Sequence, residues 1–179
     1  MVFFGFSTTN ALVSQLIRFF TRSKVSHAWL CFWDKSLKKY LVLEATFTGF
    51  ILVPLENFIR SNQVVAVYTA RPQLSEQIDM GLQQVASYLG TLYDFSNLLG
   101  FVWVCLLRWL GIKRRNPLGS PRKLVCSEAV ARVLIYGNIC SMEGLPPETT
   151  SPEDLMQFFE KSSLFQRCEL PRHGKASVE

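Results

Sequence analysis

The stretch "VSHAWLCFWDKSLKKYLVLEATF", residues 25–47, predicts a β-hairpin. Its two halves are rich in aromatic and β-branched residues, as strands are, and the lysine-rich segment 35–38 between them predicts the turn. With that turn, His27 faces Thr46 across the ladder, so His27 and Glu44 become diagonal neighbours on one face of the sheet. A slip of one residue would place them on opposite faces, so this pairing depends on the register.

The pairing of His27 with Glu44 would suit acid–base chemistry. A carboxylate beside an imidazole orients the ring and stabilises its charged form, as a general base in a nucleophilic dyad requires. The alternative is a surface histidine near a surface glutamate on an ordinary hairpin. The other histidine, His173, lies in a polar C-terminal stretch where a catalytic geometry would be hard to hold.

A candidate nucleophile stands in "KLVCSEAVARVL", residues 123–134. Cys126 comes at the start of a predicted helix, where free backbone N–H groups and the helix dipole stabilise a thiolate. Arg122 and Lys123 add positive charge just upstream. The local pattern is also compatible with a buried thiol that packs at a helix start, so it leaves both interpretations open.

Tyr93 is a further candidate residue, because Tyr93 and Asp94 follow a predicted helix that ends near Gly90. A tyrosine at such a junction commonly serves packing. It gains a functional interpretation only if the fold brings it to Cys126.

The five cysteines are an odd number and include no CxxC pair, which excludes a zinc ribbon and a thioredoxin motif. A metal site made of His27, Glu44 and Cys126 would match no common zinc spacing. No GxGxxG or GxxxxGK loop is present either. We therefore expect reduced thiols, a cytoplasmic setting and no metal or cofactor.

The chain has 179 residues, 49% of them hydrophobic and 18% charged, which fits one compact domain with an apolar binding face. Its net charge of +5 favours anionic partners. Nucleic acid is not favoured among them, because no recognised binding module surrounds the basic residues. The sequence leaves the oligomeric state open.

Residues 98–123 join an apolar run, "LLGFVWVCLLRWLGI", to a basic loop. The run is too short to span a bilayer and is interrupted by Arg108. It predicts either a core helix followed by a solvated loop or a segment that lies on an anionic membrane surface. The N-terminus lacks a basic region and a small-residue cleavage site, so we expect no signal peptide and a peripheral membrane location at most.

The order of predicted elements, strands first and then mostly helices, indicates an α+β fold with an antiparallel sheet packed against helices. Residues 49–59 predict a short strand and a turn. Two helices are well signalled: one with Ser75 as N-cap, and one with Ser151 as N-cap and Pro152 as its first residue. We expect one domain over residues 1–166 and a flexible tail over residues 167–179.

Taken together, "SHAWL", "EATFTG", "GTLYD" and "VCSEAV" occur in an order that resembles the circularly permuted, NlpC-type papain-like cysteine hydrolases, in particular the YiiX-like branch. In ordinary papain-like enzymes the cysteine precedes the histidine, whereas in the permuted branch the histidine strand comes first, as here. The later "SPEDL" segment is also similar. The resemblance extends from about Gly5 to Phe165.

The resemblance implies a role for each candidate residue. Cys126 would be the nucleophile, His27 the general base and acid, and Glu44 the residue that orients His27. Tyr93 would lie near the nucleophile and position the substrate carbonyl, and the backbone N–H of Cys126 would contribute to an oxyanion hole. The implied chemistry is attack of a thiolate on an amide or ester carbonyl to give an acyl-enzyme.

The resemblance leaves two substrate classes open, peptide amides of the cell wall and acyl chains of lipids. The expected lack of a signal peptide argues against cell-wall cleavage, and the apolar and basic segment 98–123 suits a lipid or membrane-surface substrate. The competing hypothesis is a non-catalytic, membrane-associated interaction protein that retains the fold.

Overall fold

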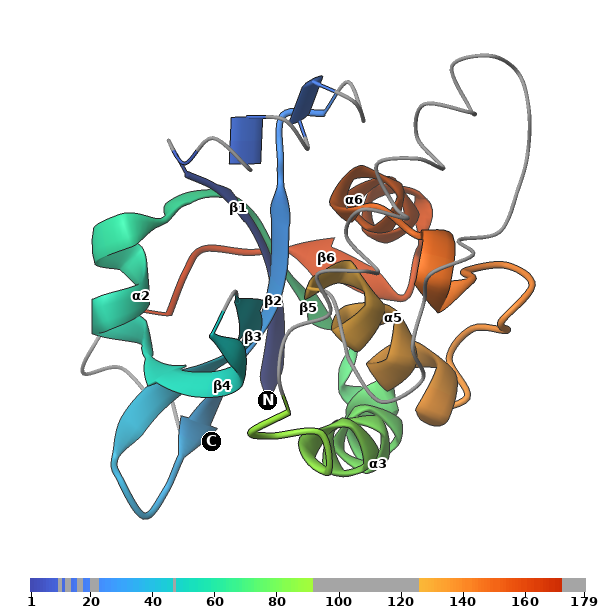
Figure 1. Ribbon diagram of the computed structural model, residues 1–179. Coiled ribbons are helices and arrows are strands. Elements are labelled where there is room, and N and C mark those ends of the chain that lie inside the picture. Colours follow the sequence, from blue (N-terminus) through green and yellow to red (C-terminus); the bar gives the residue numbers. More distant parts are fainter. Residues whose placement is uncertain are drawn as a thin grey trace.

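The computed structural model describes residues 1–9, 11, 14, 15, 18, 19, 23–46, 48–91 and 126–171. Six strands form one antiparallel sheet in the order β4-β3-β2-β1-β5-β6 (Figure 1). They are β1 (Val2–Thr8), β2 (His27–Asp34), β3 (Lys39–Thr46), β4 (Gly49–Pro54), β5 (Gln63–Ala70) and β6 (Phe165–Arg167).

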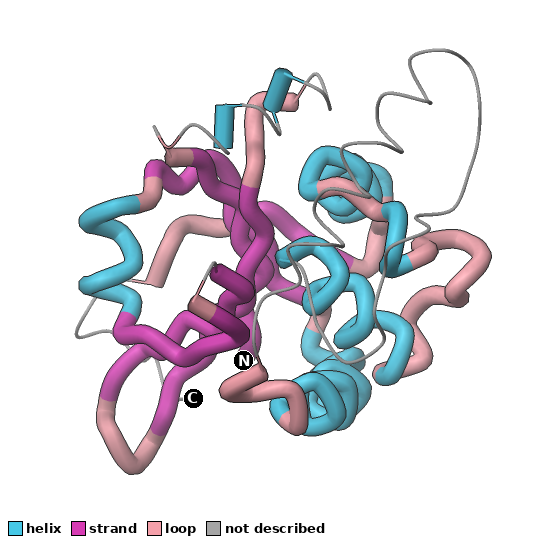
Figure 2. The backbone as a smooth tube through the Cα atoms, in the orientation of Figure 1, coloured by secondary structure: helices cyan, strands magenta, loops and turns pink. Residues whose placement is uncertain are grey.

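Helices cover both faces of this sheet (Figure 2). One face carries α3 (Ser75–Ala86), α5 (Cys126–Tyr136) and α6 (Pro152–Lys161), and the other carries α2 (Leu55–Ser61). Two short 3-10 turns, Pro72–Leu74 and Pro147–Thr149, precede α3 and α6. The predicted α+β class with an antiparallel sheet is confirmed.

The β2–β3 hairpin has the register that the sequence predicts, with Leu30 opposite Leu43 and Asp34 opposite Lys39. Leu30 and Leu43 face the core beneath α5. Alternation along the strands therefore directs His27 and Glu44 to the same face of the sheet. The turn is closed by the Leu37 N–H, which donates to the Asp34 carboxylate at 2.7 Å.

A smaller core lies on the α2 face and centres on Trp29, whose ring centroid is 4.9 Å from that of Phe58 in α2. The sequence predicted a turn where α2 forms, because the helix is short and its apolar residues are too few to show a helical period. The chain after β6 also reaches this core: Cys168 donates its N–H to the Val67 carbonyl, and Leu170 packs against the cluster.

The predicted helix caps had different outcomes. Ser151 caps α6 in a reciprocal capping box with Asp154, and Pro152 is the first residue of that helix, as predicted. Ser75 as an N-cap is wrong, since the preceding 3-10 turn runs directly into α3 and gives Ser75 itself helical dihedral angles. Leu74 occupies the cap position without a capping side chain.

Replacement of Gly5 by alanine should destabilise the fold. Gly5 pairs with Trp29 across β1 and β2, and a Cβ on Gly5 would overlap the buried indole ring. Overpacking of this kind typically costs about 1–3 kcal/mol, so we expect a corresponding fall in the free energy of unfolding, measured by urea denaturation.

Gly144→Ala is the matched control, because its Cβ would meet no atom closer than Ser141 Oγ at 3.5 Å. It should leave the free energy of unfolding within about 0.5 kcal/mol of the wild type. Equal stability of Gly5→Ala and Gly144→Ala would contradict the packing described at Trp29.

Candidate active site

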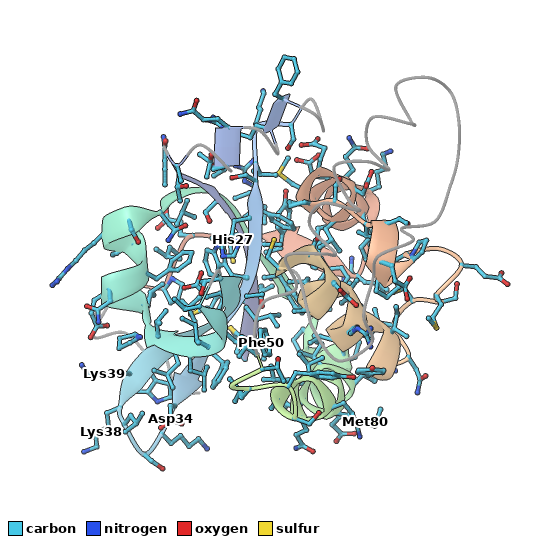
Figure 3. All side chains as sticks on the ribbon, viewed as in Figure 1. His27, Asp34, Lys38, Lys39, Phe50 and Met80 are labelled. Atoms are coloured by element: carbon cyan, nitrogen blue, oxygen red, sulfur yellow. The ribbon has the colours of Figure 1, made fainter. Side chains whose placement is uncertain are left out.

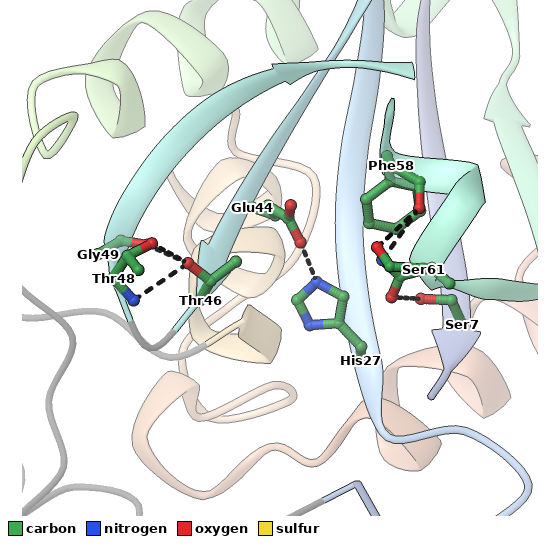
Figure 4. Close-up of polar contacts among 9 residues, drawn as sticks. Ser7, His27, Glu44, Thr46, Thr48, Gly49, Phe58 and Ser61 are labelled. Carbon is green, nitrogen blue, oxygen red and sulfur yellow. Dashed lines mark hydrogen bonds and ion pairs between the residues drawn. The ribbon is translucent and has the colours of Figure 1, made fainter. Parts of the chain in front are cut away.

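His27 and Glu44 form the first half of the site (Figure 4). Nε2 of His27 lies 2.8 Å from Oε2 of Glu44, and the side chains are 15% and 9% exposed. The two residues come from adjacent strands, so the backbone ladder of the hairpin holds them together. The contact engages one imidazole nitrogen and leaves Nδ1 for another partner.

Cys126 forms the other half, as the first residue of α5 and only 8% exposed. The imidazole of His27, together with the backbone N–H groups of Ala28 and Ser127, stabilises the thiolate form of Cys126. The helix start was predicted from the sequence, whereas the contribution of Ala28 from β2 was not. Figure 3 labels His27, which stands at the start of β2.

The two partners have pKa shifts in opposite directions. Burial alone would lower the pKa of His27, but the hydrogen bonds and negative charges of Cys126 and Glu44 outweigh it and raise this pKa to about 10. Burial alone would raise the pKa of Cys126, but the hydrogen bond and charge of His27, with the two backbone N–H donors, lower it. The arrangement therefore favours a thiolate beside an imidazolium.

Among the four described cysteines, Cys126 alone has a lowered pKa. Burial raises the pKa of Cys31 to about 12 and that of Cys140 to about 11, and it also raises the pKa of Cys168. These thiols lack a cationic partner among the described residues. A reactive thiolate is therefore expected at Cys126 and not at the other three.

Two features that support His27 were not predicted from the sequence. The ring of Phe58 lies with its centroid 6.2 Å from that of the imidazole, and this contact comes from the unpredicted helix α2. Behind the start of β2, the buried hydroxyl groups of Ser14 and Ser26 are 2.6 Å apart, and the Ser14 hydroxyl is 3.2 Å from that of Thr8. These contacts tie the residue before His27 to the end of β1.

Tyr93, Arg122 and Lys123 lie outside the described residues, as do the segment 98–123 and His173. The catalytic role of Tyr93 and the membrane-binding role of residues 98–123 therefore stay predictions. Within the described parts of the chain, no helix is both long and apolar enough to cross a bilayer.

Comparisons with known proteins agree with the fold. The family model for the permuted papain-like amidase enzymes, the YaeF/YiiX or C92 family, matches residues 6–115, more than half of the chain. No curated protein matches significantly. The crystal structure titled metalloprotein yiiX from Escherichia coli O157:H7 is similar at a TM-score of 0.62 and 19% identity, with 94% of each chain covered.

The family match includes His27 and Glu44 but ends before Cys126, so the assignment of the thiol depends on the geometry described above. The description "metalloprotein" applies to the yiiX protein of that crystal structure and is not transferred to this chain. In the described part of this chain, no group of three His, Cys, Asp or Glu side chains is placed to hold a metal ion. Nε2 of His27 and Oε2 of Glu44 are engaged with each other.

Alkylation should distinguish Cys126 from the other cysteines. With iodoacetamide at pH 6–7, we expect Cys126 to be modified first, because its lowered pKa provides thiolate where an ordinary thiol is protonated. His27→Ala removes the cation and should slow this modification by roughly tenfold or more. Peptide mass mapping over time measures each site separately.

His173→Ala is the matched control, since it removes the other histidine of the chain and should leave the rate at Cys126 unchanged. Cys31 and Cys140 serve as internal references for unactivated thiols. Modification of Cys126 at the same rate as these two, or a rate insensitive to His27→Ala, would argue against an activated thiolate.

Proposed function

This chain belongs to the permuted papain-like amidase family, the YaeF/YiiX or C92 family, and we propose that it is a cysteine amidase whose nucleophile is Cys126. The family places the chain among amidase- or peptidase-type hydrolases. The observation that supports the cysteine mechanism is the interacting Cys126–His27 pair, whose pKa values shift in opposite directions. A thiolate and an imidazolium in contact are the nucleophile and the general acid that cleavage of an amide requires.

In the proposed reaction, the Cys126 thiolate attacks the carbonyl carbon of the substrate amide, and the carbonyl electron pair moves to oxygen. His27 donates its proton to the leaving nitrogen as the C–N bond breaks, which releases an amine and leaves a thioester on Cys126. The neutral imidazole then takes a proton from water. The resulting hydroxide attacks the thioester, releases a carboxylic acid and regenerates the thiolate.

Glu44 would hold the imidazole in this reaction. Its carboxylate accepts a hydrogen bond from Nε2 of His27 at 2.8 Å, which leaves Nδ1 directed to the thiol and the leaving group. Because the carboxylate is nearly buried, it also stabilises the imidazolium more than a solvated carboxylate would. Glu44 therefore fixes both the orientation and the charge of the base.

Stabilisation of the oxyanion is proposed for the start of α5. The backbone N–H of Cys126 lies in the first turn of α5, where an N–H has no acceptor within its own helix, and the helix dipole adds positive potential there. We propose that Tyr93 adds a side-chain contact to the same carbonyl oxygen. In support, the Phe50 N–H of β4 donates to the Thr91 carbonyl, and the Gly90 N–H donates to the Phe50 carbonyl. Phe50 in turn pairs with Ala45, the neighbour of Glu44.

An amide substrate is favoured because the family is one of permuted papain-like amidase enzymes. A lipid acyl substrate and a membrane surface remain hypotheses that depend on residues 98–123. The two classes differ in the acyl group left on Cys126, so the mass of the trapped intermediate distinguishes them.

The acyl-enzyme provides the test of this function. Wild-type protein incubated with peptide amides, or in a parallel arm with medium-chain acyl esters, and quenched in acid should show an added acyl mass on Cys126. Cys126→Ala should show neither the adduct nor turnover, and His27→Ala should lower kcat by about 10³-fold or more. Both variants should unfold at a urea concentration close to that of the wild type.

Turnover retained by Cys126→Ala would contradict a thiol nucleophile. Absence of any adduct and turnover in the wild type across both arms would instead favour the non-catalytic interaction protein.

A further inference from the structure

Three buried hydroxyl groups, those of Thr8, Ser14 and Ser26, form a closed ring beside the candidate active site. The Ser26 hydroxyl donates to Thr8 Oγ1 at 3.4 Å. Thr8 Oγ1 is 3.2 Å from Ser14 Oγ, which in turn is 2.6 Å from Ser26 Oγ. Ser26 directly precedes His27, so the ring lies one residue from the proposed general base.

The hydrogen-bonding capacity of the three hydroxyls matches this ring. Each hydroxyl has one proton to donate and two lone pairs that accept. Since Ser26 donates to Thr8, the ring closes when Thr8 donates to Ser14 and Ser14 donates to Ser26. The Thr9 N–H donates to the remaining lone pair of Ser14 Oγ at 3.1 Å. Hydrogen bonds that run in one direction around such a ring polarise and strengthen one another.

The backbone joins the same two strand ends. The Ser26 N–H donates to the Ser7 carbonyl at 3.1 Å, and Ser7 is the cross-strand partner of His27 in the β1–β2 ladder (Figure 4). The register of β1 against β5 shifts at this place, between Phe6 and Ser7. The end of β1 therefore departs from a regular ladder where it meets the start of the histidine strand, and the hydroxyl ring links the two ends there.

This link bears on His27 because the hairpin ladder does not extend to it. Between the described residues of β2 and β3, backbone pairing runs from Leu30 and Leu43 to Asp34 and Lys39. His27 lies three residues beyond the first of these pairs, on the side of the chain that leads to Ser26. The backbone at His27 is therefore held through the end of β1 and through Ser26.

We propose that Thr8 and Ser14 are positioning residues of the proposed amidase, which act through Ser26 to hold the imidazole of His27 against Cys126. They act on the position of the base and not on the substrate. The inference rests on the proposed role of Cys126 as the nucleophile. Loss of one hydroxyl opens the ring and leaves buried polar groups without their partner, which should loosen the start of β2.

The pH dependence of Cys126 alkylation tests this role without an identified substrate. Thr8→Val keeps the branched shape of the side chain and removes only the hydroxyl, so it opens the ring. A less firmly held His27 stabilises the thiolate less, so the pH midpoint of iodoacetamide modification at Cys126 should rise by roughly half a unit or more. Ser14→Ala should shift the midpoint in the same direction, and Thr8→Ser, which keeps the hydroxyl, should restore the wild-type value.

Thr69→Val is the matched control, because Thr8 and Thr69 are both 7% exposed and lose the same group. Thr69 lies on β5 and donates to the Val2 carbonyl at 3.5 Å, at the other end of β1. Its replacement should leave the pH midpoint of Cys126 unchanged. Urea denaturation of each variant separates stability from position, since a ring that serves stability alone would lower the urea midpoint without moving the pH midpoint.

The outcomes separate this inference from the proposed function. A wild-type pH midpoint in both Thr8→Val and Ser14→Ala, or an equal shift in Thr69→Val, would overturn the positioning role and leave the activated thiolate standing. If Cys126 of the unmodified sequence reacts no faster than Cys31, the proposed function and this inference both fail.

Discussion

The electrostatic interaction between the Cys126 thiol and the His27 imidazole is the interaction on which the proposed chemistry depends. Both groups are largely removed from water, and burial alone would make both of them neutral. Their mutual attraction reverses this outcome, so that a thiolate and an imidazolium are favoured together. Because the pair is coupled, loss of either partner should return the other toward its neutral form.

The rest of the fold holds these two groups at the junction of the sheet and α5. The β2–β3 hairpin places Glu44 beside His27, and Cys126 at the start of α5 interacts with the same histidine. Phe58 and the hydroxyl cluster of Ser14 and Ser26 support the histidine strand from two directions. Rigid elements on both sides of the pair limit the rearrangement that would otherwise weaken the ion pair.

The local sequence predicted the elements that depend on local chemistry. The turn after Asp34 set the hairpin register, and the Ser151–Asp154 box set the start of α6. It failed where packing between distant segments decides the structure: α2 is helical because Leu55 and Phe58 pack against the Trp29 side of the sheet, and Ser75 is helical because a 3-10 turn precedes it.

The contact between Cys126 and His27 joins residues that are far apart in sequence, so no local pattern could predict it. The resemblance to permuted papain-like enzymes predicted that pairing, and in the structure the two side chains interact.

The central claim is that His27 remains charged because of Cys126. An NMR titration of the imidazole nitrogens, assigned with His27→Ala, should show His27 protonated through neutral pH with a pKa near 10, and a markedly lower pKa in Cys126→Ala. Titration of wild-type His27 near 6.5, unchanged in Cys126→Ala, would contradict the account.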